Sequence, residues 1–423
     1  MPLYFQAAQW LSLWITALLV AVPLRSRATF IELFCGCLLS KDGWVTSAIS
    51  TIHRTKHWTT YYKLLERGSI KTQALAVALF HLIQQQGAPE SKLTLVLDDT
   101  LVPRQSTLAP GSAIHFDHSH KPNRPSFMQG QVWVTIGVSL INQLGITSVL
   151  PIRSRLVPEK GNRSKLKIAQ ALIRALLSHV TGQVRVLFDA WFMRRSLILP
   201  LVKRHVSFIG RARHDTALYL PPPPRTKGQR GAPRKYGQRI TPQYREENLP
   251  VTETKLFIYG KQQCVRLQSC LALARFLNAM PVYAVWCQIW DEAKQVWSPI
   301  KLILSNETNL SAQDIVILFA RRWSIEPLFH NLKRWWGCKD MWQQTRPVLE
   351  LWMQMRSCAY ALTHMLASNL HSSFPMGDIA PWRVGRPVTA GLFLTWLRMQ
   401  YTGLSFCSAY CKKSQQFHWP FSP

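Results

Sequence analysis

Acidic residues are scarce in this chain. Its 423 residues include 21 Asp plus Glu against 51 Lys plus Arg, which gives a formal net charge of +30. Such an excess of positive charge indicates a polyanionic partner, with nucleic acid ahead of an anionic membrane surface. Because carboxylates are few, a carboxylate that follows an apolar strand is a stronger candidate for a functional role.

The cysteines lack the pattern of a disulfide framework or a zinc site. There are nine of them, an odd number, without paired CxxC spacing, and Cys35 and Cys37 are too close together for a usual zinc knuckle. The pattern indicates a reducing, cytoplasmic setting in which most cysteines are small core residues.

No basic residue precedes the long apolar run at residues 7–24, as a signal peptide would require. The run is about long enough to span a bilayer. Polar residues and Pro23 interrupt it, however. We therefore predict a buried helix and no membrane partner.

The length and the periodicity predict several packed units. Residues 1–90 read as a series of helices and form a predicted helical, DNA-binding N-terminal region. Two short helices within residues 46–65 are joined by a bend rich in Lys, Arg and His, which suits contact with a DNA groove. A plain helical hairpin is the alternative.

The character of the sequence changes at residue 93. Apolar strands are predicted at 93–99, 131–140 and 148–156, followed by a helix, a strand at 184–189, a helix and a strand at 206–211. This order predicts a mixed α/β sheet over residues 91–213. Acids stand at the carboxyl ends of the first and fourth strands, the edge at which open α/β sheets bind ligands.

Residues 214–305 are predicted to form a basic loop and a mostly β insertion. Four prolines at 221–224 precede residues 225–239, where six of fifteen residues are basic. Arg230, Arg234 and Lys235 in this segment are candidates for contact with DNA phosphates, with a solvated linker as the alternative.

Residues 306–340 are predicted to contain a helix that carries an acid between two cations. Arg322, Glu326 and Lys333 share one helical face, although ordinary surface ion pairs would give the same pattern. Pro327 requires a break, which Ser324 would provide by capping a new helix. Residues 341–423 are predicted to be a helical C-terminal region.

Three acids therefore stand out for phosphoryl transfer: Asp98 or its neighbour Asp99, then Asp189, then Glu326. Carboxylates of this kind hold two Mg²⁺ ions, one for the attacking and one for the leaving oxygen. The histidine-containing loop at residues 115–127 suits DNA contact better than zinc binding.

The motifs that contain these acids resemble those of DDE transposases of bacterial insertion sequences, most closely insertion-sequence family four. The likeness rests on Asp-Asp-Thr at 98–100, Phe-Asp-Ala-Trp-Phe at 188–192 and the spacing of Arg322, Glu326 and Lys333. Those three match the last members of the Tyr-Arg-Glu-Lys signature of that family, while Phe319 replaces its Tyr. The family tendency of Asp, any residue, Thr favours Asp98 over Asp99.

The resemblance implies a ribonuclease-H-like core and a cut-and-paste transposase. Such an enzyme cleaves double-stranded DNA at transposon ends through a hairpin intermediate and joins the ends to target DNA. It would act as a homodimer, with Mg²⁺ or a substituting Mn²⁺, in the bacterial cytoplasm at the nucleoid. The alternatives are an inactive or domesticated DNA-binding relative and a structure-specific nuclease.

Overall fold

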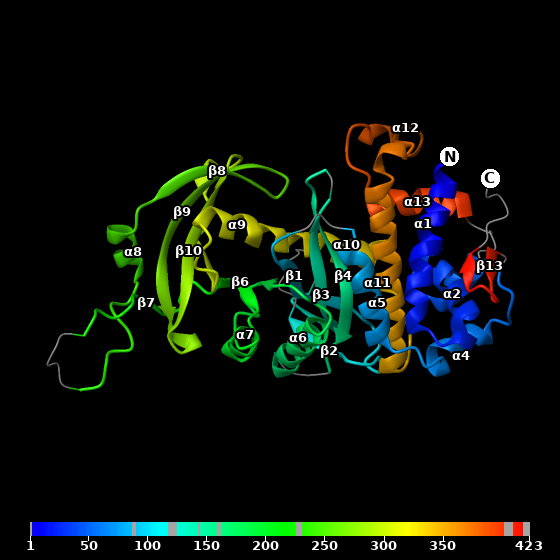
Figure 1. Cartoon of the computed structure of the whole chain (residues 1–423), viewed down its shortest axis with the longest axis horizontal. Helices are drawn as coiled ribbons and strands as arrows, with labels where there is room; N and C mark the ends of the chain where they lie inside the picture. Colours follow the sequence, from blue (N-terminus) through cyan, green and yellow to red (C-terminus); the bar gives the residue numbers. More distant parts are fainter. Residues whose placement is uncertain are drawn as a thin grey trace.

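The computed structural model describes residues 2–86, 90–116, 125–142, 144–158, 162–225, 231–401 and 409–417. The molecule is elongated, with a β-rich part at one end, a central sheet, and a helical part at the other end that holds both termini (Figure 1).

Apart from the separate pair of β13 (Tyr410–Cys411) and β14 (Gln416–Phe417), the described strands form one large mixed sheet. Twelve strands belong to it, in the order β2-β3-β1-β5-β6-β12-β10-β9-β7, with β4 paired to β3, β8 to β9 and β11 to β10. Their bounds are β1 Leu93–Pro103, β2 Ser112–Phe116, β3 Phe127–Ile141, β4 Thr147–Leu156, β5 Val184–Phe188, β6 Ser207–Ala212, β7 Leu218–Tyr219, β8 Thr252–Ile258, β9 Lys261–Ala274, β10 Met280–Asp291, β11 Val296–Trp297 and β12 Lys301–Ser305.

The middle of this sheet has the predicted strand and helix order. β1, β3 and β4 form an antiparallel meander, and β5 and β6 then run parallel to β1. All five residues of β5 are buried, as expected for a short apolar strand covered on both faces. The prediction of a mixed α/β sheet is confirmed. The short strand β2 was not predicted.

The predicted insertion is continuous with the central sheet. β12 pairs with β10 on one side and with β6 on the other. The chain leaves β6 at Ala212 and returns at Leu302, and these two residues are register partners. The segment between them contains β7, β8, β9, β10 and β11, and β12 bridges the two parts of the sheet.

Helices cover the sheet and build the other end of the molecule. The helices are α1 Leu3–Leu18, α2 Arg27–Leu39, α3 Val45–Ser50, α4 Thr59–Arg67, α5 Thr72–Gln84, α6 Asn162–Leu177, α7 Arg195–Val202, α8 Pro242–Asn248, α9 Ala312–Ala320, α10 Ile325–Arg334, α11 Arg346–Asn369, α12 Met376–Ile379 and α13 Ala390–Tyr401. The long helix α11 is buried over most of its length and contacts β4, α2, α5 and α13. The two terminal regions thus pack together around α11 (Figure 1).

The apolar N-terminal segment is a core helix. Residues Leu3–Ala21 are long and apolar enough to cross a membrane by length and composition. One side of α1 is nevertheless buried in the hydrophobic core, through Ala7, Leu11, Trp14 and Leu18. This agrees with the expectation of a buried helix.

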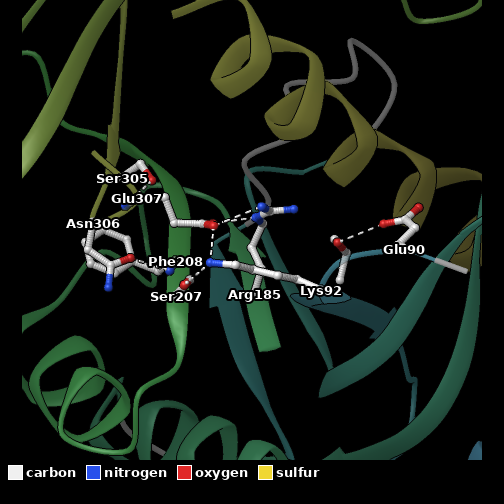
Figure 2. A network of polar contacts seen from close by, with 9 residues as sticks. Glu90, Lys92, Arg185, Ser207, Phe208, Ser305, Asn306 and Glu307 are labelled. Atoms are coloured by element: carbon white, nitrogen blue, oxygen red, sulfur yellow. Dashed lines mark hydrogen bonds and ion pairs between the residues drawn. The ribbon is translucent and has the colours of Figure 1, made fainter. Parts of the chain in front are cut away.

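An ionic cluster ties the strands together at the edge where β1, β5 and β6 begin (Figure 2). Glu307, directly after β12, accepts hydrogen bonds from Arg185 in β5, with 2.9 Å between Nη2 and Oε1, and pairs with Lys92 ahead of β1. Only 3% of the Glu307 side chain is exposed. Burial alone would raise the pKa of Glu307, but hydrogen bonds from Arg185 and Lys92 hold it below its usual value.

Two glycines join the N-terminal region to the end of the helix that carries Glu326. Gly337 has φ +62°, and a Cβ there would lie 2.0 Å from the backbone of Asp42 and of Gly43. A Cβ on Gly43 would lie 2.1 Å from the Gly337 oxygen. The two backbones therefore touch directly, which side chains at either position would prevent.

We expect Gly337→Ala to lower the free energy of unfolding by about 2 to 4 kcal/mol, from left-handed backbone strain plus overpacking. Urea unfolding measures this change. The matched control is Gly385→Ala, at φ +80° with nothing within 4 Å of the added Cβ, which retains only the backbone term. Equal losses in the two variants would contradict the close contact.

Candidate active site

The first two acids lie side by side because two parallel strands bring them there. Leu97 in β1 is the register partner of Phe188 in β5, so Asp98 and Asp189 follow at the same level. Asp189 comes directly after β5. The expectation that Asp98 also ends its strand is wrong, because β1 continues to Pro103 in antiparallel pairing with β3.

Asp98 and Asp99 have different partners. Arg322 Nη1 lies 2.8 Å from Asp98 Oδ2, whereas Lys165 Nζ of α6 lies 2.8 Å from Asp99 Oδ2. Successive side chains of a strand point to opposite faces. The structure therefore places Asp98 with the other candidate residues and turns Asp99 toward α6.

A break in the helix delivers the third acid. Ser311 and Asp314 form a capping box at the start of α9. α9 ends at Ala320, a 3-10 turn η4 spans Arg321–Ser324, and α10 begins at Ile325 with Pro327 in its first turn. Ser324 occupies the N-cap position as expected, although its hydroxyl makes no capping hydrogen bond.

Arg322 connects the acids. Its Nη2 lies 3.1 Å from Glu326 Oε1, so one guanidinium group binds both Asp98 and Glu326. Lys333 Nζ donates to the Leu101 oxygen at 2.8 Å, which places this cation against β1. Phe319, at the position of the signature Tyr, is 8% exposed and packs in the core.

All three acids act electrostatically on Arg322. Burial raises the pKa of Asp98 to about 7; the Arg322 charge opposes this, and Asp99 and Asp189 add to it. Burial would lower the pKa of Arg322, but Asp98, Asp189 and Glu326 together raise it. Arg322 is thus the counter-ion for the whole acid group.

The acids have the donor chemistry of a magnesium site but not its spacing. Carboxylate oxygens are the ligands that Mg²⁺ prefers. Among the described residues, no three His, Cys, Asp or Glu side chains are gathered closely enough to hold a metal ion. The Arg322 guanidinium stands between Asp98 and Glu326 instead, and supplies the positive charge there.

A wide, basic groove opens beside Glu326. Its volume is about 1270 Å³, and it extends from α10 past β1 and β3 to Trp44, ahead of α3. Five basic residues line it, namely Arg104, His330, Lys333, Arg334 and Lys339. Of these, only Lys333 belongs to the signature read from the sequence. His330 and Arg334 lie beside Lys333 on α10, whereas Arg104 and Lys339 come from separate segments and gave no signal in the sequence.

The remaining phosphate-contact candidates lie elsewhere. Arg234 and Lys235 are between β7 and α8, and β7 is the strand at the far edge of the sheet (Figure 1). The structure does not bring them to the acids. Arg230 lies outside the described residues, as does the central part of the 115–127 loop.

Sequence reasoning missed Tyr259, which reaches this site from the insertion. It stands in the turn between β8 and β9 with φ +55°, and its ring centroid is 6.1 Å from that of Trp323. Burial raises the pKa of Tyr259, and the charges of Arg322 and Glu326 also act on it. The Tyr-Gly pair indicates a turn in the sequence, but the sequence does not show which residues the turn contacts.

Comparison with known proteins gives the class of protein: a transposase. The family described as "Transposase DDE domain" matches residues 90–362, a range that includes Asp98, Asp189 and Glu326. Because this match spans more than half of the chain, the chain belongs to the DDE transposase family. The resemblance seen in the sequence is confirmed at this level, and the narrower assignment to insertion-sequence family four stays a prediction.

Among solved structures, the chain is similar to the piggyBac transposase in a synaptic complex with hairpin DNA. The identity is 14%, the TM-score is 0.41, and the match covers 89% of this chain and 71% of that chain. No curated protein matches the sequence.

Proposed function

We propose that this chain is a cut-and-paste DNA transposase with a ribonuclease-H-like core, in which Asp98, Asp189 and Glu326 hold the catalytic metal. Family membership supports DNA transposition in general. The observation that carries the specific chemistry is the action of all three acids on the single Arg322 guanidinium. Acids brought together from two strands and a distant helix fit phosphoryl transfer.

DDE transposases generally use divalent metals, and Mg²⁺, or Mn²⁺ in its place, would activate the attacking oxygen and stabilise the leaving oxygen. The ligands would be the carboxylate oxygens of Asp98, Asp189 and Glu326. Arg322 stands between Asp98 and Glu326, and a metal ion held there would take over its role as their counter-ion. The fork of donors on Arg322 then suits a DNA phosphate.

The residues of the chain position the DNA. Lys333 and Arg322 neutralise phosphate charge where it develops. In cleavage, the oxygen of water attacks phosphorus, the bond to the 3′ oxygen breaks, and a 3′-hydroxyl and a 5′-phosphate result. In joining, that 3′ oxygen attacks a target phosphorus, loses its proton to solvent, and displaces the 3′ oxygen of the target, which takes up a proton.

The test is a cleavage and joining assay with duplex DNA that carries the terminal repeat of the element and a plasmid target, in Mg²⁺. A transposase cuts the end and joins it to the plasmid. Cutting without joining would identify a structure-specific nuclease instead, and binding without cutting would identify an inactive DNA-binding relative.

We expect Lys333→Ala to weaken binding of end DNA and to reduce the slope of log affinity against log salt by about 0.9, because one phosphate contact is lost. Fluorescence anisotropy over a salt series measures this slope. Lys294→Ala is the control, since Lys294 is exposed between β10 and β11 and lines none of the described cavities. An unchanged slope for Lys333→Ala would remove Lys333 from the phosphate clamp.

A cut-and-paste reaction brings two transposon ends together, so we expect a homodimer bound to double-stranded DNA. Because its partner is DNA, we expect the protein in the cytoplasm at the nucleoid. The positive charge of +30 supports the DNA partner. The helical region at residues 1–90 is the proposed DNA-binding part, because the bend between α3 and α4 exposes His53, Arg54 and His57. Residues 91–213 and 306–340 would then form the catalytic part, interrupted by the insertion and followed by the C-terminal helices.

A further inference from the structure

A second cavity is lined by arginines and begins at the chain neighbour of Asp189. It has a volume of about 620 Å³ and includes Ala190, the residue directly after Asp189. Its charged lining consists of Arg194, Arg195, Arg213, Asp215 and Arg275. Four arginines against one aspartate leave an excess of three positive charges.

Most of these arginines have no protein partner. Arg213 forms a double hydrogen bond with Asp215, at 3.1 Å for both contacts. For Arg194, Arg195 and Arg275, the described part of the chain provides no side-chain hydrogen bond or ion pair, and all three are exposed. Unpaired guanidinium forks around one hollow fit phosphate groups, which they can bind through two donors at once.

The two cavities flank the acids on opposite sides. The groove beside Glu326 is lined from α10 and from β1 and β3, and these two strands precede β5 in the order of the sheet. The arginine pocket is lined from the segments after β5 and β6 and from Arg275 of the 3-10 turn η3, Arg275–Leu277. Asp98 and Asp189, at the boundary of β1 and β5, therefore lie between them.

The geometry of in-line displacement suggests that the groove beside Glu326 and the arginine pocket bind different DNA molecules. The attacking and leaving oxygens stand on opposite sides of the phosphorus, so the two DNA molecules that are joined must approach the acids from different directions. The groove beside Glu326 continues toward the N-terminal helices and suits the transposon end. The arginine pocket is then available to bind the target DNA.

We propose that the pocket formed by Arg194, Arg195, Arg213 and Arg275 holds the phosphate backbone of target DNA during strand transfer. This inference rests on the proposed transposase function. Arg194 and Arg195 begin α7, whose N-terminal peptide groups add to the positive potential. Arg275 comes from the insertion, so the pocket needs both parts of the sheet.

The test uses the full chain with Arg194→Ala and Arg275→Ala combined. A matched control combines Arg386→Ala with Lys294→Ala, which removes the same charge from exposed positions that line none of the described cavities. Circular dichroism confirms folding. A further variant with Arg194→Lys and Arg275→Lys keeps the charge and should recover most of the salt dependence.

Two readouts are taken. Anisotropy with a duplex of random sequence, which stands for target DNA, should show a salt slope lower by about 1.8, for two lost phosphate contacts. In the cleavage and joining assay, the joining yield per cleaved end should fall about tenfold, because charge-assisted hydrogen bonds to the target are lost. The control pair should match the wild type in joining per cleaved end.

Binding and joining at the level of the control pair would overturn the inference. A parallel fall of cleavage and joining would also overturn it, since the pocket would then serve the transposon end. If the wild type binds DNA but cuts nothing, the proposed function fails. In that case the salt slope for the random duplex still tests the pocket. If the double alanine variant has the slope of the wild type, the pocket is not a DNA-binding site; if its slope is lower, the pocket binds DNA.

Discussion

Asp98→Asn should reduce DNA cleavage at least about 1,000-fold, because a catalytic metal contributes several kcal/mol to the transition state and each 1.4 kcal/mol is a factor of ten. Asp98 lies in the electrostatic field of Asp189 and binds Arg322. Its amide would remove a metal ligand and leave the shape of the site intact. The cleavage assay described above measures the loss.

Asp99→Asn is the matched control, one residue along the same strand. It loses the ion pair with Lys165, at 2.8 Å, and should keep most of the cleavage activity. Thermal melting gives a second readout, since Mn²⁺ that binds the folded state raises the melting temperature. Asp98→Asn should lose this increase and Asp99→Asn should keep it. The reverse result would assign the ligand to Asp99.

Glu307→Ala should lower the free energy of unfolding by about 3 to 5 kcal/mol, because it leaves buried cations without their counter-charge. Arg185 and Lys92 both bind Glu307, and the side chains of Arg185 and Glu307 are only 7% and 3% exposed (Figure 2). Urea unfolding measures the change. Because this cluster is at the edge of the sheet away from the acids, the effect should be on stability first.

Glu253→Ala is the control for Glu307. The Glu253 carboxylate pairs with Arg266 across two strands, at 2.6 Å, but the two side chains are 56% and 36% exposed. An exposed pair of this kind is worth about 1 kcal/mol or less. A loss for Glu307→Ala that is no larger than the loss for Glu253→Ala would show that the cluster does not clamp the strands.

The same cluster predicts a pH dependence. The pKa of Glu307 is lower in the folded protein than its ordinary value of 4.5. Its contribution to stability is therefore complete above pH 4.5 and is lost as the pH falls through the lower, folded pKa. Between pH 7 and acid, the wild type should lose more stability than Glu307→Ala does. Parallel curves would contradict the lowered pKa.

The sequence predicted what depends on local pattern. Apolar runs gave the order of strands and helices, and Asp98 and Asp189 meet because each follows one of two register partners, Leu97 and Phe188, on neighbouring parallel strands. Ser324 and Pro327 correctly marked the start of α10. These features follow from capping, periodicity and strand direction, which neighbouring residues determine.

What escaped prediction depends on contacts between distant segments. Nothing near Arg322 in the sequence indicates that it binds Asp98, and nothing links Arg194 with Arg275. The segment that contains Arg234 and Lys235 has a clear composition, yet the structure places these two residues next to β7 at the far edge of the sheet. Charge composition indicates a polyanionic partner but not which surface the partner contacts.

The pairing of β6 with β12 shows how the insertion could have been acquired and how it could be removed. Because Ala212 and Leu302 are register partners, a short turn could join them and leave an ordinary hairpin. A shortened enzyme made in this way would expose β12 as an edge strand. Its buried Leu302, Ile303 and Leu304 would then invite association with other chains unless charges replaced them. The insertion therefore also covers the β12 edge of the catalytic sheet, through the pairing of β12 with β10.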